Sequence, residues 1–251
     1  MAENERRNLS YMGTVEGTLD MTGHAYNRVS VTGELAVKGT LNCNELVVNG
    51  TFSDEGKLKA KKVKINGEAR VKGDLESDRL KVNGQIEVGG TAIVKELHTM
   101  GTAVVQDCVV SDKIDLLGDI SIKNDCNTET FVSRGAFDIG GLLNASRIDI
   151  RLFGPCRVKE IGGENISIRR VRRALFDHAL TFILPGHGFS GNLATDSIEG
   201  DDVFVEYTAA KVVRGNNVKI GKGCDIGLVE YKNSFEQDKS SKIKEHVKTG
   251  N

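Results

Sequence analysis

The sequence contains no tryptophan, only two prolines and few other aromatic residues. Its rings are limited to 4 tyrosines and 9 phenylalanines among 251 residues, whereas enzyme cores usually take much of their buried area from large aromatic side chains. An excess of positive charge is also missing, because 34 lysines and arginines stand against 35 aspartates and glutamates. Proteins that bind nucleic acid normally carry a clear basic surplus, so we expect no nucleic-acid partner.

Paired cysteines and long apolar segments are absent as well. The five cysteines are scattered and form no CxxC pair, which argues against a disulfide framework and against a zinc site. The charged N-terminal residues 1–8 lack the apolar core of a secretory signal. The most apolar run, residues 179–184, is far too short to span a bilayer. These features predict a soluble cytoplasmic protein.

Glycine, in contrast, is abundant and regularly spaced. Seven of the 29 glycines follow one another at a constant 17-residue interval, namely Gly33, Gly50, Gly67, Gly84, Gly101, Gly118 and Gly135. The residues two and thirteen places after each of these glycines are apolar in all seven copies. Several columns that stay in phase over seven copies are the signature of a solenoid, in which each repeat forms one coil.

Within a repeat, apolar and polar residues alternate, as in Leu35-Ala-Val37 and Leu41-Asn-Cys43. A period of two is typical of strands with one buried face, and a unit this small buries its apolar face only by stacking on the next. The predicted fold is therefore an all-β parallel β-helix in which each 17-residue repeat is one coil. The left-handed helix of hexapeptide repeats has coils of three hexads, one residue longer than this repeat, and only residues 220–231 resemble it.

The repeat breaks after Gly135, and this divides the chain. We expect a flexible leader at 1–12, a β-solenoid at 13–168, an excursion at 169–196, further solenoid coils at 197–232 and a polar tail at 233–251. The excursion begins with basic residues and continues with apolar ones, with a short helix expected over 171–183. Its candidate contact residues are Arg169, Arg170, Arg172, Arg173, Phe176 and Phe182. They fit a docking site for a partner, attachment to an anionic membrane surface, or a segment folded back on the rod.

Convergent reactive groups are not visible in the sequence. The five histidines are dispersed and have no metal-ligand spacing, and no phosphate-binding loop or nucleophile elbow is present. Asp54 is the one acid in an inward column. We therefore predict a protein that is not an enzyme, with no catalytic residue, cofactor or metal. The alternative is a hexapeptide-repeat-type acyltransferase, in which His178 or His187 would be the general base.

The two ends of a β-helix present unpaired backbone groups, which pair with another chain unless they are capped. The coils near the C-terminus carry Val218, Ile220, Ile226, Val229 and Tyr231. We expect these five residues to form an assembly interface with a second copy of the chain.

The 17-residue glycine–aliphatic repeats and the run from Ile198 to Tyr231 resemble the bactofilins, in particular a longer firmicute-type branch. This resemblance implies a right-handed β-helix that assembles end to end into nonpolar filaments without nucleotide. It also implies a scaffold in cell shape, polar organisation or motility. The implied partners are the chain itself and a paralogue or a cell-envelope or motility protein. Peripheral membrane association is a further implied location.

Overall fold

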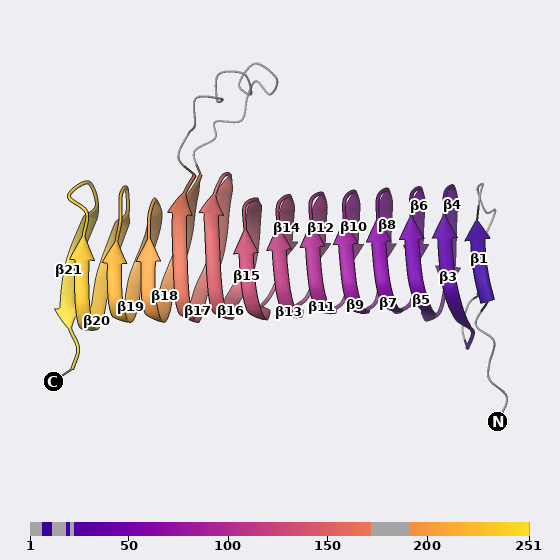
Figure 1. Ribbon diagram of the computed structural model, residues 1–251, viewed down its shortest axis with the longest axis horizontal. Helices are drawn as coiled ribbons and strands as arrows, with labels where there is room; N and C mark the ends of the chain where they lie inside the picture. Colours follow the sequence, from indigo (N-terminus) through magenta and orange to yellow (C-terminus); the bar gives the residue numbers. More distant parts are fainter. Residues whose placement is uncertain (1–6, 12–18, 21–22, 172–190, 251) are drawn as a thin grey trace, which may run out of the picture.

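The computed structural model describes residues 7–11, 19–20, 23–171 and 191–250. These residues form a long rod of about 12 stacked turns, with the N-terminal strands at one end and the C-terminal strands at the other (Figure 1). Every regular element in the described ranges is a β-strand, and the strands of successive turns are parallel. The predicted β-solenoid is confirmed.

Each turn of the N-terminal half contains a short strand that follows the repeating glycine and a longer one that completes the coil. The short strands are β2 (Leu19–Asp20), β4 (Glu34–Lys38), β6 (Thr51–Asp54), β8 (Glu68–Val71), β10 (Gln85–Val88), β12 (Thr102–Val105) and β14 (Asp119–Ile122). The longer strands are β1 (Arg7–Tyr11), β3 (Ala25–Val31), β5 (Leu41–Val48), β7 (Leu58–Ile65), β9 (Leu75–Val82), β11 (Ala92–Thr99), β13 (Val109–Leu116) and β15 (Cys126–Ser133).

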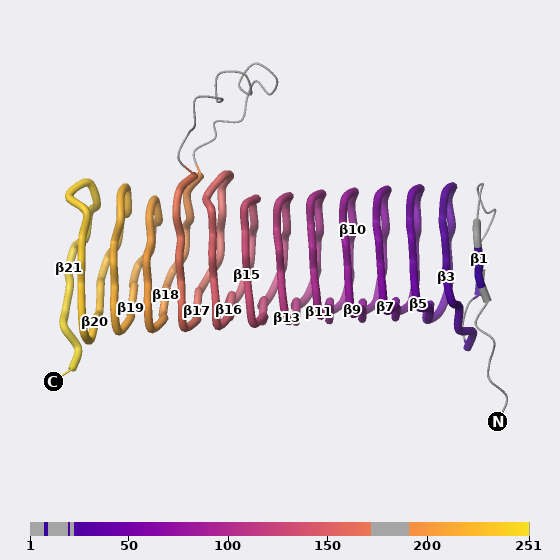
Figure 2. Tube along the Cα trace, viewed as in Figure 1, coloured from indigo at the N-terminus to yellow at the C-terminus, as the bar shows by residue number. Residues whose placement is uncertain are grey.

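Toward the C-terminus the two strands of a coil merge into one bent strand. These strands are β16 (Ala136–Leu152), β17 (Pro155–Arg170), β18 (Asn192–Val205), β19 (Thr208–Ile220) and β20 (Asp225–Gln237). The last strand, β21 (Lys242–Lys248), is short and pairs with the first part of β20. Figure 2 shows that the path of the coils continues without a break from the first half of the rod into the second.

One buried column shows how the register is kept and where it changes. It includes Val29, advances by the same 17-residue step at each coil as far as Ile148, and then passes through Ile166, Val203 and Val218. The step to Val203 is long because residues 171–191 lie between β17 and β18. The coils on either side still stack directly, so the excursion interrupts the sequence of the solenoid and not its core.

The core consists of these stacked aliphatic columns. Residues that alternate along each strand are buried and exposed in turn, as in the pattern of β7, Leu58–Ile65. Phe52 and Phe131 are the largest fully buried side chains, and the other core members are mainly valine, leucine and isoleucine. Because a single coil contributes only a few of these side chains, each coil depends on its neighbours for burial.

Outward side chains form polar ladders with the same 17-residue spacing. Lys57 Nζ lies 2.6 Å from Asp74 Oδ2, and Lys59 Nζ lies 2.7 Å from Glu76 Oε2. Asn66 donates its side-chain amide to the Asn49 oxygen at 2.7 Å. These pairs are solvent-exposed, so water and salt screen them and they add little to stability. They reinforce the register that the core sets.

The strand boundaries differ from the predicted segments in three places. Strand β1 lies within the expected leader, β17 runs on to Arg170 and β18 starts at Asn192, which shortens the excursion. The expected tail contains the end of β20 and all of β21. It does so because Phe235 and Ile243 continue the columns of Val218 and Ile226. The helix expected over 171–183 falls almost wholly outside the described residues.

Cysteines serve mainly as small core residues, and Cys43 and Cys126 are buried. Burial raises the pKa of the Cys126 and Cys156 thiols to about 12. Cys108 is the one cysteine that is not fully buried.

We therefore expect Cys108 alone to react rapidly with a thiol reagent in the native protein, since the reactive species is an accessible thiolate. Titration with an aromatic disulfide reagent should modify close to one thiol per chain before denaturant is added. The Cys108→Ser variant should lose this fast phase, and a fast phase that persists in the variant would contradict the expected protection of the buried thiols.

Candidate assembly and docking surfaces

The C-terminal end of the rod is formed by β21, which pairs with β20 and with no other described strand. Most of its side chains are exposed, with Ile243 half-buried. Ile243 stacks on Ile226 at the end of a core column. One side of β21 and the end of this column are therefore open to a further strand.

An aromatic cluster lies beside this open end. The rings of Tyr231 and Phe235 stack at 5.3 Å between centroids, and His246 meets Phe235 edge-on at 5.0 Å. His246 pairs with Val229 and so occupies the last position of a core column. The terminal coil therefore presents aromatic rings next to the unpaired edge of β21.

The five assembly residues expected from the sequence lie deeper in the rod than residues of an end surface would. Val218, Ile220, Ile226 and Val229 are each at most 2% exposed, because β20 and β21 cover their columns. Tyr231 is half-buried and belongs to the terminal cluster. Sequence reasoning missed Phe235, Ile243 and His246, although each follows a core residue by the 17-residue step.

The N-terminal end is built in a similar way from β1, whose described partner is β3 alone. Leu9 packs against the core, and Asn8 accepts a hydrogen bond from the Asn27 amide at 3.0 Å. The two ends of the rod thus both finish in a parallel strand with one paired side in the described structure.

A different surface runs along the side of the rod, where the coils turn just before the repeating glycines. We call it the turn edge. Its residues in successive coils are Asn49, Asn66, Asn83, Met100, Leu117, Arg134, Arg151 and Arg169. The chemistry therefore changes along the edge from amide to apolar to guanidinium. Phe153 and Val171 add exposed apolar side chains next to the arginines, at 51% and 45% exposure.

Arg169 and Arg170 end β17 at this edge, and both contact aromatic rings. The Arg169 guanidinium lies 5.0 Å from the ring centre of Phe204, and that of Arg170 lies 4.3 Å from the ring centre of Tyr207. The Arg170 backbone N–H donates to Glu206 at 3.1 Å. The other four predicted contact residues, Arg172, Arg173, Phe176 and Phe182, lie outside the described residues.

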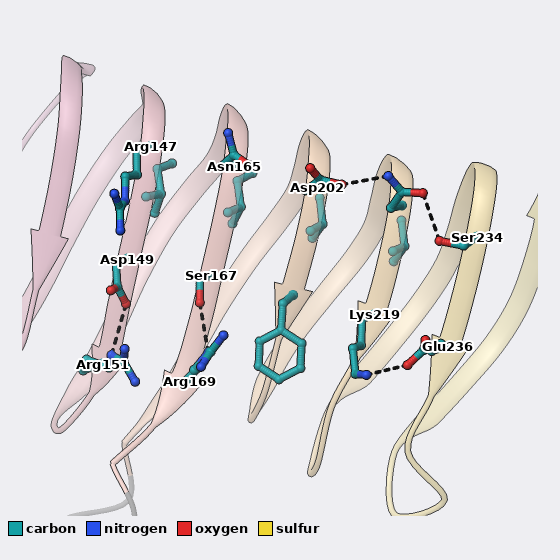
Figure 3. A pocket seen from close by; sticks show the side chains of 16 residues that line it. Arg147, Asp149, Arg151, Asn165, Ser167, Arg169, Asp202, Lys219, Ser234 and Glu236 are labelled. Atoms are coloured by element: carbon teal, nitrogen blue, oxygen red, sulfur yellow. Dashed lines mark hydrogen bonds and ion pairs between the residues drawn. The ribbon is translucent and has the colours of Figure 1, made fainter.

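A shallow groove of about 800 Å³ extends from the turn edge over the outward faces of β16 to β20. Figure 3 shows Arg147, Arg151 and Arg169 projecting into it from neighbouring strands, with Lys219 farther along. Lys219 pairs with Glu236, and Asp202, Asn217 and Ser234 form a hydrogen-bonded chain across three coils. We refer to this site as the arginine groove.

The described residues contain no group of three or more histidine, cysteine or acidic side chains placed to hold a metal ion. None of the elements described is a helix long and apolar enough to cross a bilayer. His178 and His187, the candidate general bases, lie outside the described residues.

The geometry defines a β-solenoid whose ends are open strands and whose side carries a charged groove. Residues 4–92 match the family model of the bactofilins, described as polymer-forming cytoskeletal proteins. The match agrees with the resemblance to the bactofilins that the sequence predicted, and it covers residues 4–92.

Two relatives come from Bacillus subtilis (strain 168), and both are described as uncharacterized proteins. YhbF is 42% identical over 109 residues, which cover 43% of this chain and 42% of YhbF. YhbE is 34% identical over 111 residues, which cover 44% of each protein. The chain thus spans less than half the length of these relatives. No solved structure matches the chain.

Proposed function

We propose that this protein is a cytoskeletal scaffold that assembles end to end into filaments without nucleotide. The observation that carries the proposal is the open C-terminal coil, where β21 offers a strand edge and Ile243 ends a core column. The match of residues 4–92 to a polymer-forming family supports it. Scaffolding in cell shape, polar organisation or motility, with a paralogue or an envelope or motility protein as further partner, belongs to the same proposal.

Stacking of a second copy on β21 gains the interactions that hold the rod itself together. Each added strand satisfies a row of backbone N–H and C=O groups and covers the exposed part of Ile243. The lysines of β21, Lys242, Lys244 and Lys248, are exposed on the side of the coil. Because these lysines lie on the side of the coil, they do not block a second copy from stacking on its end. Their charge favours solubility of the free ends.

Replacing Ile243 by lysine tests this interface. The side chain is half-buried in the single chain, so the fold should survive, whereas a stacked coil would bury the new charge without a partner, which is costly. We expect the purified wild-type protein to form filaments without nucleotide in negative-stain micrographs and to sediment. The Ile243→Lys variant should stay in the supernatant and keep its β-rich circular dichroism.

The matched control is Ile93→Lys, the same change at a residue that is 47% exposed on the side of the rod. This variant should polymerise like the wild type. Filaments formed equally by Ile243→Lys would exclude the open coil as the interface. Discrete trimers of the wild-type protein would instead fit the acyltransferase alternative.

A further inference from the structure

Neighbouring strands of the rod place both opposite and like charges side by side, and the like pairs include Lys64 with Lys81. In the earlier coils, neighbouring strands often place opposite charges side by side, as in Arg70 with Glu87 at 2.9 Å and Arg79 with Glu96 at 2.9 Å. At the turn edge, Arg151 of β16 pairs in register with Arg169 of β17. Like charges directly opposite each other on adjacent strands are destabilising, and an anion bound between them would relieve the repulsion.

The partners of these arginines leave positive charge available. Arg151 is paired with Asp149, its Nε lying 3.1 Å from the carboxylate. Arg169 donates to the Ser167 hydroxyl at 3.1 Å and rests on Phe204, both of which are neutral. Within the ranges that the structure describes, neither Arg169 nor Arg147 forms an ion pair with a carboxylate. Two unneutralised guanidiniums therefore face the arginine groove.

The remainder of the groove has mixed polarity. Asp149, Asp202 and Glu236 line it together with the basic side chains, and Phe204 contributes a half-buried ring. Where the groove meets the turn edge, Val171, which is 45% exposed, provides an apolar rim. A ligand that fits must bring separated negative charges, groups that hydrogen-bond with polar side chains, and an apolar part.

From this arrangement we propose that the arginine groove binds an acidic segment of a partner protein, with carboxylates on Arg169 and Arg147 and an apolar side chain against the rim. Guanidinium groups bind carboxylates through paired N–H donors. A uniformly anionic lipid surface fits less well, because Asp149, Asp202 and Glu236, which also line the groove, would repel it. This inference deepens the scaffold role, and it rests on residues away from the ends that polymerise.

The test uses the full chain and a fluorescein-labelled peptide of alternating glutamate and leucine, with binding followed by fluorescence anisotropy. We expect saturable binding and no binding of the matched glutamine–leucine peptide. Arg169→Glu should weaken binding by about tenfold or more, since a hydrogen-bonded charge contributes about 1.5–3 kcal/mol. Arg169→Lys should keep only part of the affinity, because an ammonium group lacks the paired N–H donors of a guanidinium and does not stack on an aromatic ring as a guanidinium does.

The matched control is Arg70→Glu, which makes the same charge change on β8, far along the rod (Figure 1). It should leave peptide binding unchanged. An equal loss in Arg70→Glu would show general charge attraction and would overturn the proposal. Binding to phosphatidylglycerol vesicles that is lost in Arg169→Glu, without any peptide binding, would overturn it in favour of a membrane. Sedimentation of the same samples reports polymerisation, so failure of the groove is distinguished from failure of the assembly interface.

Discussion

Replacement of Gly84 by alanine is expected to lower the free energy of unfolding by about 3 kcal/mol or more. A Cβ at this position would lie 2.0 Å from the Gly67 carbonyl oxygen and 2.6 Å from that of Asn66. Both are backbone atoms of the preceding coil, so no side chain can move aside. The same coil contact is held by the Gln85 N–H, which donates to the Gly67 oxygen at 2.9 Å. Relief of the clash would break this ladder.

Gly162→Ala is the control for this substitution. The nearest atom to its Cβ would be the Asn144 side-chain oxygen at 3.5 Å, which is ordinary contact. Its stability should stay within about 0.5 kcal/mol of the wild type. Urea unfolding followed by far-ultraviolet circular dichroism measures both variants. Equal midpoints for the two would contradict the role of close coil contact at the repeating glycines.

Replacement of Asp54 by valine is expected to stabilise the protein by about 2 kcal/mol at pH 8. Asp54 stands between Val37 and Val71 in a core column and is 1% exposed. One of its oxygens accepts the Gly56 N–H at 2.8 Å, while the other has no hydrogen-bond partner. Burial raises the pKa of this carboxyl from 3.8 to about 6, and the Gly56 N–H offsets part of that rise.

The gain from Asp54→Val should depend on pH. A carboxyl whose pKa is raised by folding binds its proton more tightly in the folded state. Its contribution to the free energy of unfolding is therefore most favourable below about pH 4. That contribution decreases as the pH rises toward 6, and it no longer changes with pH above that value. Between low and high pH, the contribution of Asp54 to the stability of the fold decreases by about 3 kcal/mol. The valine variant avoids this loss, but it also lacks the Gly56 hydrogen bond, which contributes about 1 kcal/mol. The net gain is therefore about 2 kcal/mol.

Unfolding by urea at several pH values between 4 and 8 measures this difference, and the other carboxyl groups cancel in the comparison of the two proteins. The stability difference between Asp54→Val and the wild type should grow over this range. A stability difference that does not change with pH would mean that the Asp54 carboxyl titrates in the folded state as it does in water.

Much of the fold was predictable because the repeat is strict from Gly33 to Gly135. Glycine at the turn and aliphatic residues two apart suffice to predict strands, inward columns and parallel stacking. The last coils were harder to recognise, because they lack the glycine and carry many charged residues. Phe235 and Ile243 preserve the phase nonetheless, and following the 17-residue step past Tyr231 would have placed them.

The candidate surfaces were predicted less well than the fold. The sequence directed attention to Val229 and its neighbours as an end of the rod, but whether a coil is terminal depends on which residues stack on it. The arginine groove had no signal beyond Arg169 and Arg170. Arg147 and Phe204 join it through register, and residues in register can be far apart in the chain when an excursion separates two coils.

The amino-acid sequence by itself determined that this chain forms stacked coils with apolar interiors, because a strict short period leaves alternating residues no other way to be buried. Only the tertiary structure decided which coil ends the rod and which arginines share a groove. The first depends on which strand stacks on β20, and the second on how coils of unequal length align from β16 to β17. Such alignment is a property of the whole ladder of hydrogen bonds.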